Sequence, residues 1–186
     1  MAMKSVAIAF DACVLINILA SGRSKEIIKS LECPTCICTA VEKEILYLGR
    51  KKILPSLSPS PLDSLVEDTN LTVNAIESDK EREDFVEYSR QIGKGEAMTI
   101  AIASTRQWAV ATDDKKAIRI ATSALIHGRD SIWTTPDVIR YWVDTMSPSQ
   151  RDASQAIRRI ERIGRYRPPA RHALREWWNL TKEVVC

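Results

Sequence analysis

The 186-residue chain has few histidines and lacks a long hydrophobic run free of polar residues. Its two histidines, His127 and His172, stand far apart in the sequence, which disfavours a mechanism based on paired imidazoles. The longest apolar stretch, residues 6–20, is interrupted by Asp11 and Asn17. We therefore expect neither a membrane span nor a cleaved signal peptide, and we expect a cytoplasmic protein.

The chain also lacks a cysteine pattern that would support a disulfide framework, because it contains five cysteines, an odd number. Cys33 and Cys36 have a C-x-x-C spacing, but a structural zinc site needs a second pair of ligands, and the sequence offers none nearby. We expect Cys36 and Cys38 to be small buried residues around a strand, with a weak redox role as the alternative.

The net charge of +3 is small but unevenly distributed. Residues 148–186 hold nine of the 27 basic residues and four of the 24 acidic ones, a balance of +5. The other 147 residues hold 18 basic and 20 acidic ones, a balance of −2. Arg158, Arg162 and Arg165 share one helical stripe. This asymmetry indicates either an anionic partner for the tail or an ordinary solvated helix face.

Apolar runs typical of strands alternate with helical patterns along most of the chain. The expected strands are residues 6–10, 36–39, 71–76, 108–112 and 131–134. The expected helices are residues 13–20, 24–32, 40–48, 61–68, 79–92, 97–106, 114–125, 136–145, 148–163 and 170–184. Residues 51–61, rich in proline and serine, are expected to form an extended loop. This order predicts an α/β fold with a mainly parallel central sheet, in which strand 71–76 is an edge strand.

Acidic residues occur near the ends of strands or the starts of helices at four places. These are Asp11, Glu42 with Glu44, Glu96, and Asp113 with Asp114. The carboxyl ends of parallel strands meet at one edge of the sheet, so these carboxylates are expected to converge. Two like charges about 4 Å apart repel by roughly 4 kcal/mol at an effective dielectric near 20. A cation that prefers oxygen ligands, Mg²⁺ or Mn²⁺, would relieve this repulsion.

Each acid alone also has a structural explanation. Asp11 could cap the helix that follows it, and Glu96 could be an ordinary glutamate of a first helical turn. One of Asp113 and Asp114 is expected to cap the helix that begins KKAI. Glu42 and Glu44 are two residues apart on one helix, so both cannot point the same way. Only the recurrence of acids at one sheet edge favours a site.

Four segments, in this order and spacing, resemble a PIN domain over roughly residues 5 to 145. They are DACVLIN, TAVEKEILYL, GKGEAMTIAIA and AVATDDKKAIRIA. The resemblance implies a three-layer, Rossmann-like α/β/α fold and the metal-dependent ribonuclease activity of VapC-type toxins. By position, the resemblance assigns the metal-site acids to Asp11, Glu44, Glu96, and Asp113 or Asp114. Glu44 is favoured over Glu42 because the acid of the family precedes a run like ILYL, and Asn17 and Thr112 match supporting polar positions.

The resemblance divides the chain into a PIN-like nuclease domain, residues 1–147, and a basic helical C-terminal extension, residues 148–186. The expected reaction is hydrolysis of an RNA phosphodiester by water activated at Mg²⁺ or Mn²⁺. An antitoxin protein and a second copy of the chain are further candidate partners. The alternative is a catalytically degenerate module that binds nucleic acid or a protein. An aspartyl nucleophile at Asp11 is disfavoured because Cys13, not an acid, follows two residues later.

Overall fold

The computed structural model describes residues 7–50 and 61–183 and contains a five-stranded sheet in the order β3-β2-β1-β4-β5. Its strands are β1 (Ile8–Phe10), β2 (Thr35–Cys38), β3 (Leu71–Asn74), β4 (Ala109–Ala111) and β5 (Ile132–Trp133). All four strand pairings are parallel, which confirms the predicted α/β class. The predicted strand positions are confirmed with shifts of one or two residues at their ends. The predicted edge strand is β3, which pairs only with β2 in this sheet.

Helices connect the strands and continue beyond the last one. They are α1 (Ala12–Ser21), α2 (Ser24–Ser30), α3 (Thr39–Arg50), α4 (Pro61–Asp68), α5 (Asp79–Ser89), α6 (Lys94–Arg106), α7 (Lys115–Ala124), α8 (Thr135–Met146), α9 (Gln150–Arg159) and α10 (Arg175–Glu183). A 3₁₀ turn, Gly128–Ser131, precedes β5, and a π-helical turn, Ile160–Gly164, follows α9. The predicted loop 51–61 lies outside the described residues except for Pro61, the first residue of α4. Among the described residues, no helix has the length and apolar character needed to cross a membrane.

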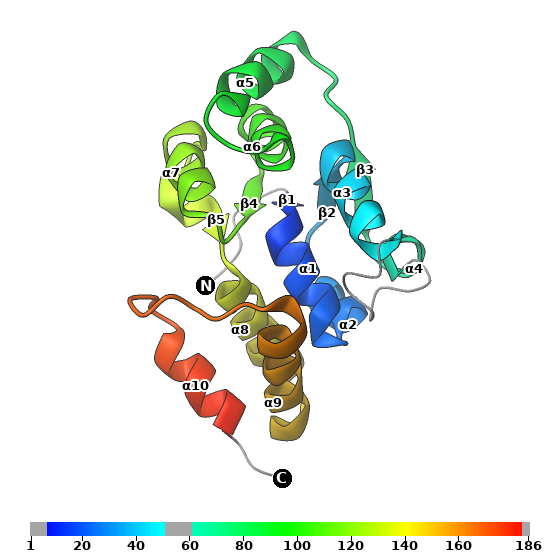
Figure 1. The fold of residues 1–186 in the computed structure, drawn as a ribbon, viewed down its shortest axis with the longest axis vertical. Coiled ribbons are helices and arrows are strands. Elements are labelled where there is room, and N and C mark those ends of the chain that lie inside the picture. Colours follow the sequence, from blue (N-terminus) through cyan, green and yellow to red (C-terminus); the bar gives the residue numbers. More distant parts are fainter. Residues whose placement is uncertain (1–6, 51–60, 184–186) are drawn as a thin grey trace.

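The sheet is the middle of three layers, because alternate residues of its strands face opposite sides. In β1, Ile8 and Phe10 belong to one hydrophobic cluster, while Ala9 belongs to another. The first cluster packs under α1, α2, α3 and α8, and the second under α6 and α7. Figure 1 shows α5, α6 and α7 gathered on one side of the sheet and α1, α2 and α8 on the other. Since both faces are covered, β1, β2 and β4 are buried along their whole length.

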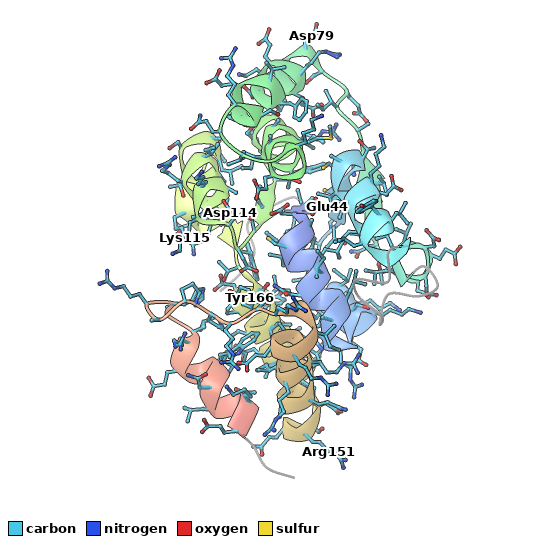
Figure 2. The ribbon with its side chains drawn as sticks, in the orientation of Figure 1. Glu44, Asp79, Asp114, Lys115, Arg151 and Tyr166 are labelled. Carbon is cyan, nitrogen blue, oxygen red and sulfur yellow. The ribbon has the colours of Figure 1, made fainter. Side chains whose placement is uncertain are left out.

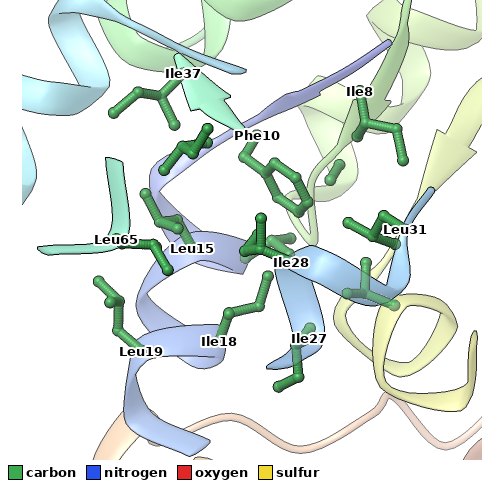
Figure 3. Packing of buried hydrophobic residues seen from close by; sticks show 14 of the residues in the cluster. Ile8, Phe10, Leu15, Ile18, Leu19, Ile27, Ile28, Leu31, Ile37 and Leu65 are labelled. Atoms are coloured by element: carbon green, nitrogen blue, oxygen red, sulfur yellow. The ribbon is translucent and has the colours of Figure 1, made fainter. Parts of the chain in front are cut away.

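The larger cluster surrounds Phe10 with side chains from α1 and α2, including Leu15, Ile18 and Ile28 (Figure 3). Each of these side chains is fully buried. Burying one such side chain contributes about 1.5–3 kcal/mol. This packing fixes the start of α1 against the end of β1. Cys36 and Cys38 are also buried in β2, which confirms their expected structural role.

The C-terminal extension packs on the same core as the strands. Ile157 of α9, Ile160 of the π-helical turn and Trp178 of α10 are fully buried members of the cluster that contains Phe10. Arg159 donates a hydrogen bond from Nε to the carbonyl oxygen of Ala20, 3.2 Å away, at the end of α1. Residues 148–183 therefore continue the hydrophobic core, and the division at residue 147 into two units stays a prediction.

Candidate functional site

The carboxyl ends of β1 and β4 form the edge at which a site is expected. The strand order runs outward from these two neighbours in opposite directions, and such a switch point creates the crevice where open α/β sheets bind ligands. The register aligns Phe10 with Ala111, and the Asp11 N–H donates to the Ala111 carbonyl at 2.9 Å. Asp11 and Thr112 therefore lie side by side at the ends of the two central strands.

Asp11 has a buried carboxylate, with only 3% of the residue exposed. Its Oδ1 accepts from the Ala12 N–H at 2.7 Å, so Asp11 caps α1 as the sequence suggested. Its Oδ2 accepts from Thr112 Oγ1 at 3.0 Å and from Cys13 Sγ at 3.1 Å. Burial and, to a smaller extent, the charge of Glu96 raise the pKa of Asp11 from 3.8 to about 6, against the lowering effect of these hydrogen bonds. The carboxylate that caps α1 is therefore costly to ionise in the folded protein.

Glu96 and Glu44 lie near each other at the start of α6. Glu96 is in the first turn of α6, and its Oε2 accepts from the Gly93 N–H at 2.9 Å. Glu44 is an exposed residue of α3, and a Cβ added to Gly95 would lie 3.5 Å from Glu44 Oε2. Partial burial raises the pKa of Glu44, and the charge of Glu96 adds to this effect. Glu96 therefore acts electrostatically on both Glu44 and Asp11.

Asp113 and Asp114 have different surroundings although they are adjacent. Asp113 Oδ1 accepts from the Thr135 N–H at 2.9 Å, and Oδ2 accepts from Thr135 Oγ1 at 2.5 Å and Asn17 Nδ2 at 3.2 Å. The side chain of Tyr166 also acts on Asp113 and lowers its pKa. Burial raises the pKa of Asp113, while these hydrogen bonds oppose the shift.

Asp114 caps α7, as predicted for one member of the pair. Its Oδ1 accepts from the Lys116 and Ala117 N–H groups at 2.7 and 2.8 Å. Figure 2 labels Glu44, Asp114 and Tyr166, which come from α3, the turn after β4 and the segment after the π-helical turn. Asp114 therefore caps a helix, whereas Asp113 accepts hydrogen bonds from residues of α1 and α8.

The same network corrects one expected helix cap. The sequence predicts Thr135 as the N-cap of the helix expected at residues 136–145, but Thr134 holds this position and forms a capping box with Asp137. The hydroxyl of Thr135 donates to Asp113 instead. The sequence TTP allowed either threonine, and the contact with Asp113 decides between them.

Within residues 7–50 and 61–183, no three Asp, Glu, His or Cys side chains are grouped closely enough to hold a metal ion without rearrangement. Glu96 is turned back toward Gly93, and Asp113 is held by its hydrogen-bond donors. The donor chemistry nevertheless fits a hard divalent cation, because carboxylate oxygens predominate and the negative charge of Glu96 acts on both Asp11 and Glu44. A change in the side-chain torsions of Glu96 is required to bring its carboxylate to a shared ion.

Sequence reasoning missed two residues that contact Asp113. Thr135 was interpreted only as a helix cap, and Tyr166 was not singled out. The TTPD sequence indicates a helix start that could bind a carboxylate, but no local pattern places Tyr166 beside an acid more than 50 positions earlier. In the sequence, Cys13 attracts attention only because no acid stands at its position. In the structure, its thiol contacts both Asp11 and the Asp113 N–H.

The fold and this edge define an all-parallel α/β protein with acidic residues around the β1–β4 switch point. A family model described as a PIN domain matches residues 7–134, and the chain belongs to that family. The resemblance to a PIN domain is therefore confirmed. PIN domains are generally nucleases and typically use divalent metal ions. Searches of curated proteins and of solved structures gave no match.

Proposed function

We propose that this protein is a metal-dependent ribonuclease that hydrolyses phosphodiester bonds in RNA. The observation that supports it most is the arrangement of Asp11, Glu44 and Glu96. These carboxylates come from three distant segments, and the charge of Glu96 raises the pKa of both Asp11 and Glu44. Helix capping accounts for Asp11 and Glu96 singly, but a shared cation would offset the repulsion between these carboxylates from separate segments.

In this proposal, Asp11, Glu44 and Glu96 hold Mg²⁺ or Mn²⁺, and Asp113 borders the ion from the end of β4. Thr112 and Cys13 fix the orientation of Asp11 through its Oδ2. Asp114 stays the cap of α7 and is the weaker candidate of its pair. When bound, the divalent cation supplies a hydroxide nucleophile at neutral pH and stabilises the charge on the leaving oxygen.

The residues around these acids support an anionic substrate. Lys94, Lys115, Lys116 and Arg119 are exposed residues of α6 and α7, the two helices that begin beside Glu96 and Asp114. Their charges can neutralise backbone phosphates, and the amino ends of both helices favour negative charge as well. RNA is preferred over DNA because the resemblance is to ribonuclease toxins of the family.

The decisive assay is cleavage of a mixed RNA pool by the purified protein with Mg²⁺, Mn²⁺ or EDTA. We expect cleavage with a divalent cation and none with EDTA. Asp11→Asn and Glu96→Gln should abolish cleavage while the circular dichroism spectrum stays native. Asp79→Asn is the matched control, because Asp79 is an exposed acid at the start of α5, at the far end of the molecule in Figure 2. Full activity in both site variants would contradict the assignment.

The second candidate is a PIN-like module that binds nucleic acid or a protein without cleaving it. Two features of the side chains favour this candidate. Glu96 and Asp114 both take part in helix capping. Among the described residues, no group of acids surrounds a single ion position. RNA binding by a folded protein that cleaves no RNA with either Mg²⁺ or Mn²⁺ would establish this alternative.

A toxin role within this proposal has its own test. Expression of the wild-type chain in a bacterial host should arrest growth, whereas Asp11→Asn should not. An antitoxin or a second copy of the chain would then be the partners to seek by co-purification and light scattering. Equal growth with both chains at equal protein levels would remove the toxin assignment without affecting the proposed chemistry.

A further inference from the structure

We propose that Arg162, Arg165 and Arg171, here called the arginine strip, bind phosphates of the RNA substrate beside the edge of the sheet where β1 and β4 end. This inference rests on the proposed function, because it adds a phosphate-binding surface to the same site. The family match ends at residue 134, so the strip lies in the part of the chain beyond it. The C-terminal extension then contributes to substrate binding as well as to the core.

The segment that carries the strip is strongly positive. Residues 158–175 hold seven arginines and one acidic residue, Glu161, a balance of +6 with the histidine neutral. Glu161 forms ion pairs with Arg167 and Lys182. The three arginines of the strip are exposed, and none of them pairs with a carboxylate of the described residues. Their charges are therefore available to an anion from solution.

Close packing brings the start of this segment to α1. A Cβ added to Gly164 would lie 2.5 Å from Asn17 Oδ1, so glycine lets the π-helical turn lie directly against α1. Asn17 Nδ2 donates to Asp113 Oδ2 at 3.2 Å. Arg165 follows Gly164 in a left-handed conformation, with φ of 55°, and caps the π-helical turn. The backbone at Arg165 is therefore linked through Asn17 to the end of β4.

The other end of the segment contacts the end of β5. His172 Nε2 lies within hydrogen-bond distance of Thr134 Oγ1, at 2.9 Å, and Thr134 directly follows β5. Arg171 immediately precedes this contact. Figure 1 shows the segment, in orange, leaving the end of α9 and passing the start of α8. Since both ends of the segment reach the carboxyl ends of strands, the strip runs along the edge where Asp11 and Asp113 lie.

Basic residues from the first part of the chain lie near the same edge. Lys115 and Lys116 are exposed at the start of α7, directly after the cap residue Asp114. In Figure 2, Asp114 and Lys115 lie above Tyr166, which is the neighbour of Arg165. The start of α7 and the strip therefore present positive charge from two directions. An RNA strand that contacts both passes over the acidic residues between them.

The composition of the strip favours nucleic acid over an acidic protein as its partner. Among the described residues, none of the exposed large apolar side chains lies between positions 161 and 175. The centre of a protein–protein interface is rich in aromatic and apolar residues, whereas surfaces that bind nucleic acid are polar and positively charged. A guanidinium group also matches the geometry of a phosphate through paired N–H donors. The strip therefore fits an RNA backbone.

Binding of a short, labelled single-stranded RNA in EDTA, measured by fluorescence anisotropy, tests the strip in the absence of cleavage. The triple variant Arg162→Gln, Arg165→Gln, Arg171→Gln should bind about 10-fold more weakly, because phosphate contacts supply much of the affinity. The slope of log affinity against log salt should become shallower by about 2, since each phosphate contact on a single strand contributes about 0.7. Lysine at the same three positions should keep most of the affinity, because it keeps the charge.

The matched control removes the same charge from exposed positions away from the edge. It carries Arg82→Gln and Arg90→Gln on α5 and Arg151→Gln at the far end of α9, which Figure 2 labels. Charges farther away than the Debye length, about 8 Å at physiological salt, are largely screened, so this control should keep RNA affinity within about twofold of wild type. Both triple variants should show native circular dichroism, because all six side chains are exposed.

The outcomes separate this inference from the proposed function. Unchanged RNA affinity in the strip variant, or an equal loss in the control, would overturn the strip even if the wild type cleaves RNA. Loss of a co-purifying acidic protein with RNA affinity unchanged would overturn it in favour of a protein partner. A wild type that binds RNA through the strip but cleaves none with Mg²⁺ or Mn²⁺ would contradict the proposed nuclease and leave the strip in place.

Discussion

Replacing Asp11 by asparagine should make the metal-free protein more stable while removing its activity. Burial raises the pKa of Asp11 from its ordinary value of 3.8 to about 6. At neutral pH, keeping this carboxylate ionised in the folded state costs about 3 kcal/mol, since each pKa unit corresponds to about 1.4 kcal/mol. Asparagine has almost the same shape and no charge, so the substitution removes this cost.

The gain in stability from Asp11→Asn is limited because the substitution changes some of the hydrogen bonds at this position. The side-chain oxygen of asparagine can still accept from the Ala12 N–H, but its amide must face Thr112 and Cys13, which now donate to a carboxylate oxygen. The Thr112 hydroxyl can rotate and accept, whereas the contact with the Cys13 thiol is weakened. A net gain of about 1–3 kcal/mol therefore corresponds to a rise in Tm of roughly 2–12 °C for a domain of this size.

The pH dependence of this gain has a definite sign. The folded-state pKa of Asp11 lies above its unfolded value, so folding binds a proton between pH 6 and pH 4. The cost is full above pH 6 and disappears below about pH 4. The stability difference between Asp11→Asn and wild type should therefore shrink as the pH falls from 7 to 4. A variant that is less stable than wild type in EDTA at pH 7, or a difference independent of pH, would refute this reasoning.

Added metal should make the wild type more stable than Asp11→Asn. A ligand at 100 times its Kd stabilises the folded state by about 2.7 kcal/mol, and only a protein that binds it gains this. Added Mn²⁺ should raise the Tm of the wild type but not that of Asp11→Asn. Asp79→Asn, a change in an exposed residue of α5, is the control and should follow the wild type at each pH and metal concentration. Equal metal stabilisation of Asp11→Asn and wild type would remove Asp11 from the binding site.

Substitutions at four further positions test other parts of the structure. Glu96→Gln should abolish cleavage. Its circular dichroism spectrum should stay native, because the amide oxygen can still accept from the Gly93 N–H in the cap of α6. Glu44→Gln should weaken Mn²⁺ binding in calorimetry without lowering the metal-free Tm, since Glu44 is exposed. Asp114→Ala should lower the free energy of unfolding in urea by about 1 kcal/mol, and Asp114→Asn should restore it with cleavage retained. Lost cleavage in Asp114→Asn would instead make this acid a ligand. Gly22→Ala should cost about 1 kcal/mol or more in the same assay, because φ is 76° there.

Much of the sheet could be predicted because its strands are buried and bounded by clear helix signals. The apolar run before Asp11 contains β1, and the segment WAVAT contains β4. The parallel pairing of these strands follows from the intervening helices. The helix predicted at residues 97–106 begins three residues earlier, at Lys94. The capping interaction between Gly93 and Glu96 extends the helix, and its signal lies in the spacing of these two residues.

The surroundings of Asp113 could not be predicted in the same way. That one of Asp113 and Asp114 caps α7 follows from local sequence, but which one faces the interior depends on hydrogen bonds from Thr135 and Asn17. These contacts join positions far apart in the chain, and no periodic pattern encodes them. The sequence likewise indicates a basic helical stripe in the extension, but not the packing of Ile157 and Ile160 against the core.

The most direct test of the proposed cation site is a crystal structure of the protein soaked in Mn²⁺, in which anomalous scattering locates the ion. The proposed site predicts a Mn²⁺ ion at the carboxyl ends of β1 and β4, bound by Asp11 and Glu96, with Glu96 turned away from Gly93. Glu44 should reach the same ion from α3. A fully soaked crystal with no ion at this edge, or an ion bound away from Asp11, would contradict the proposed site.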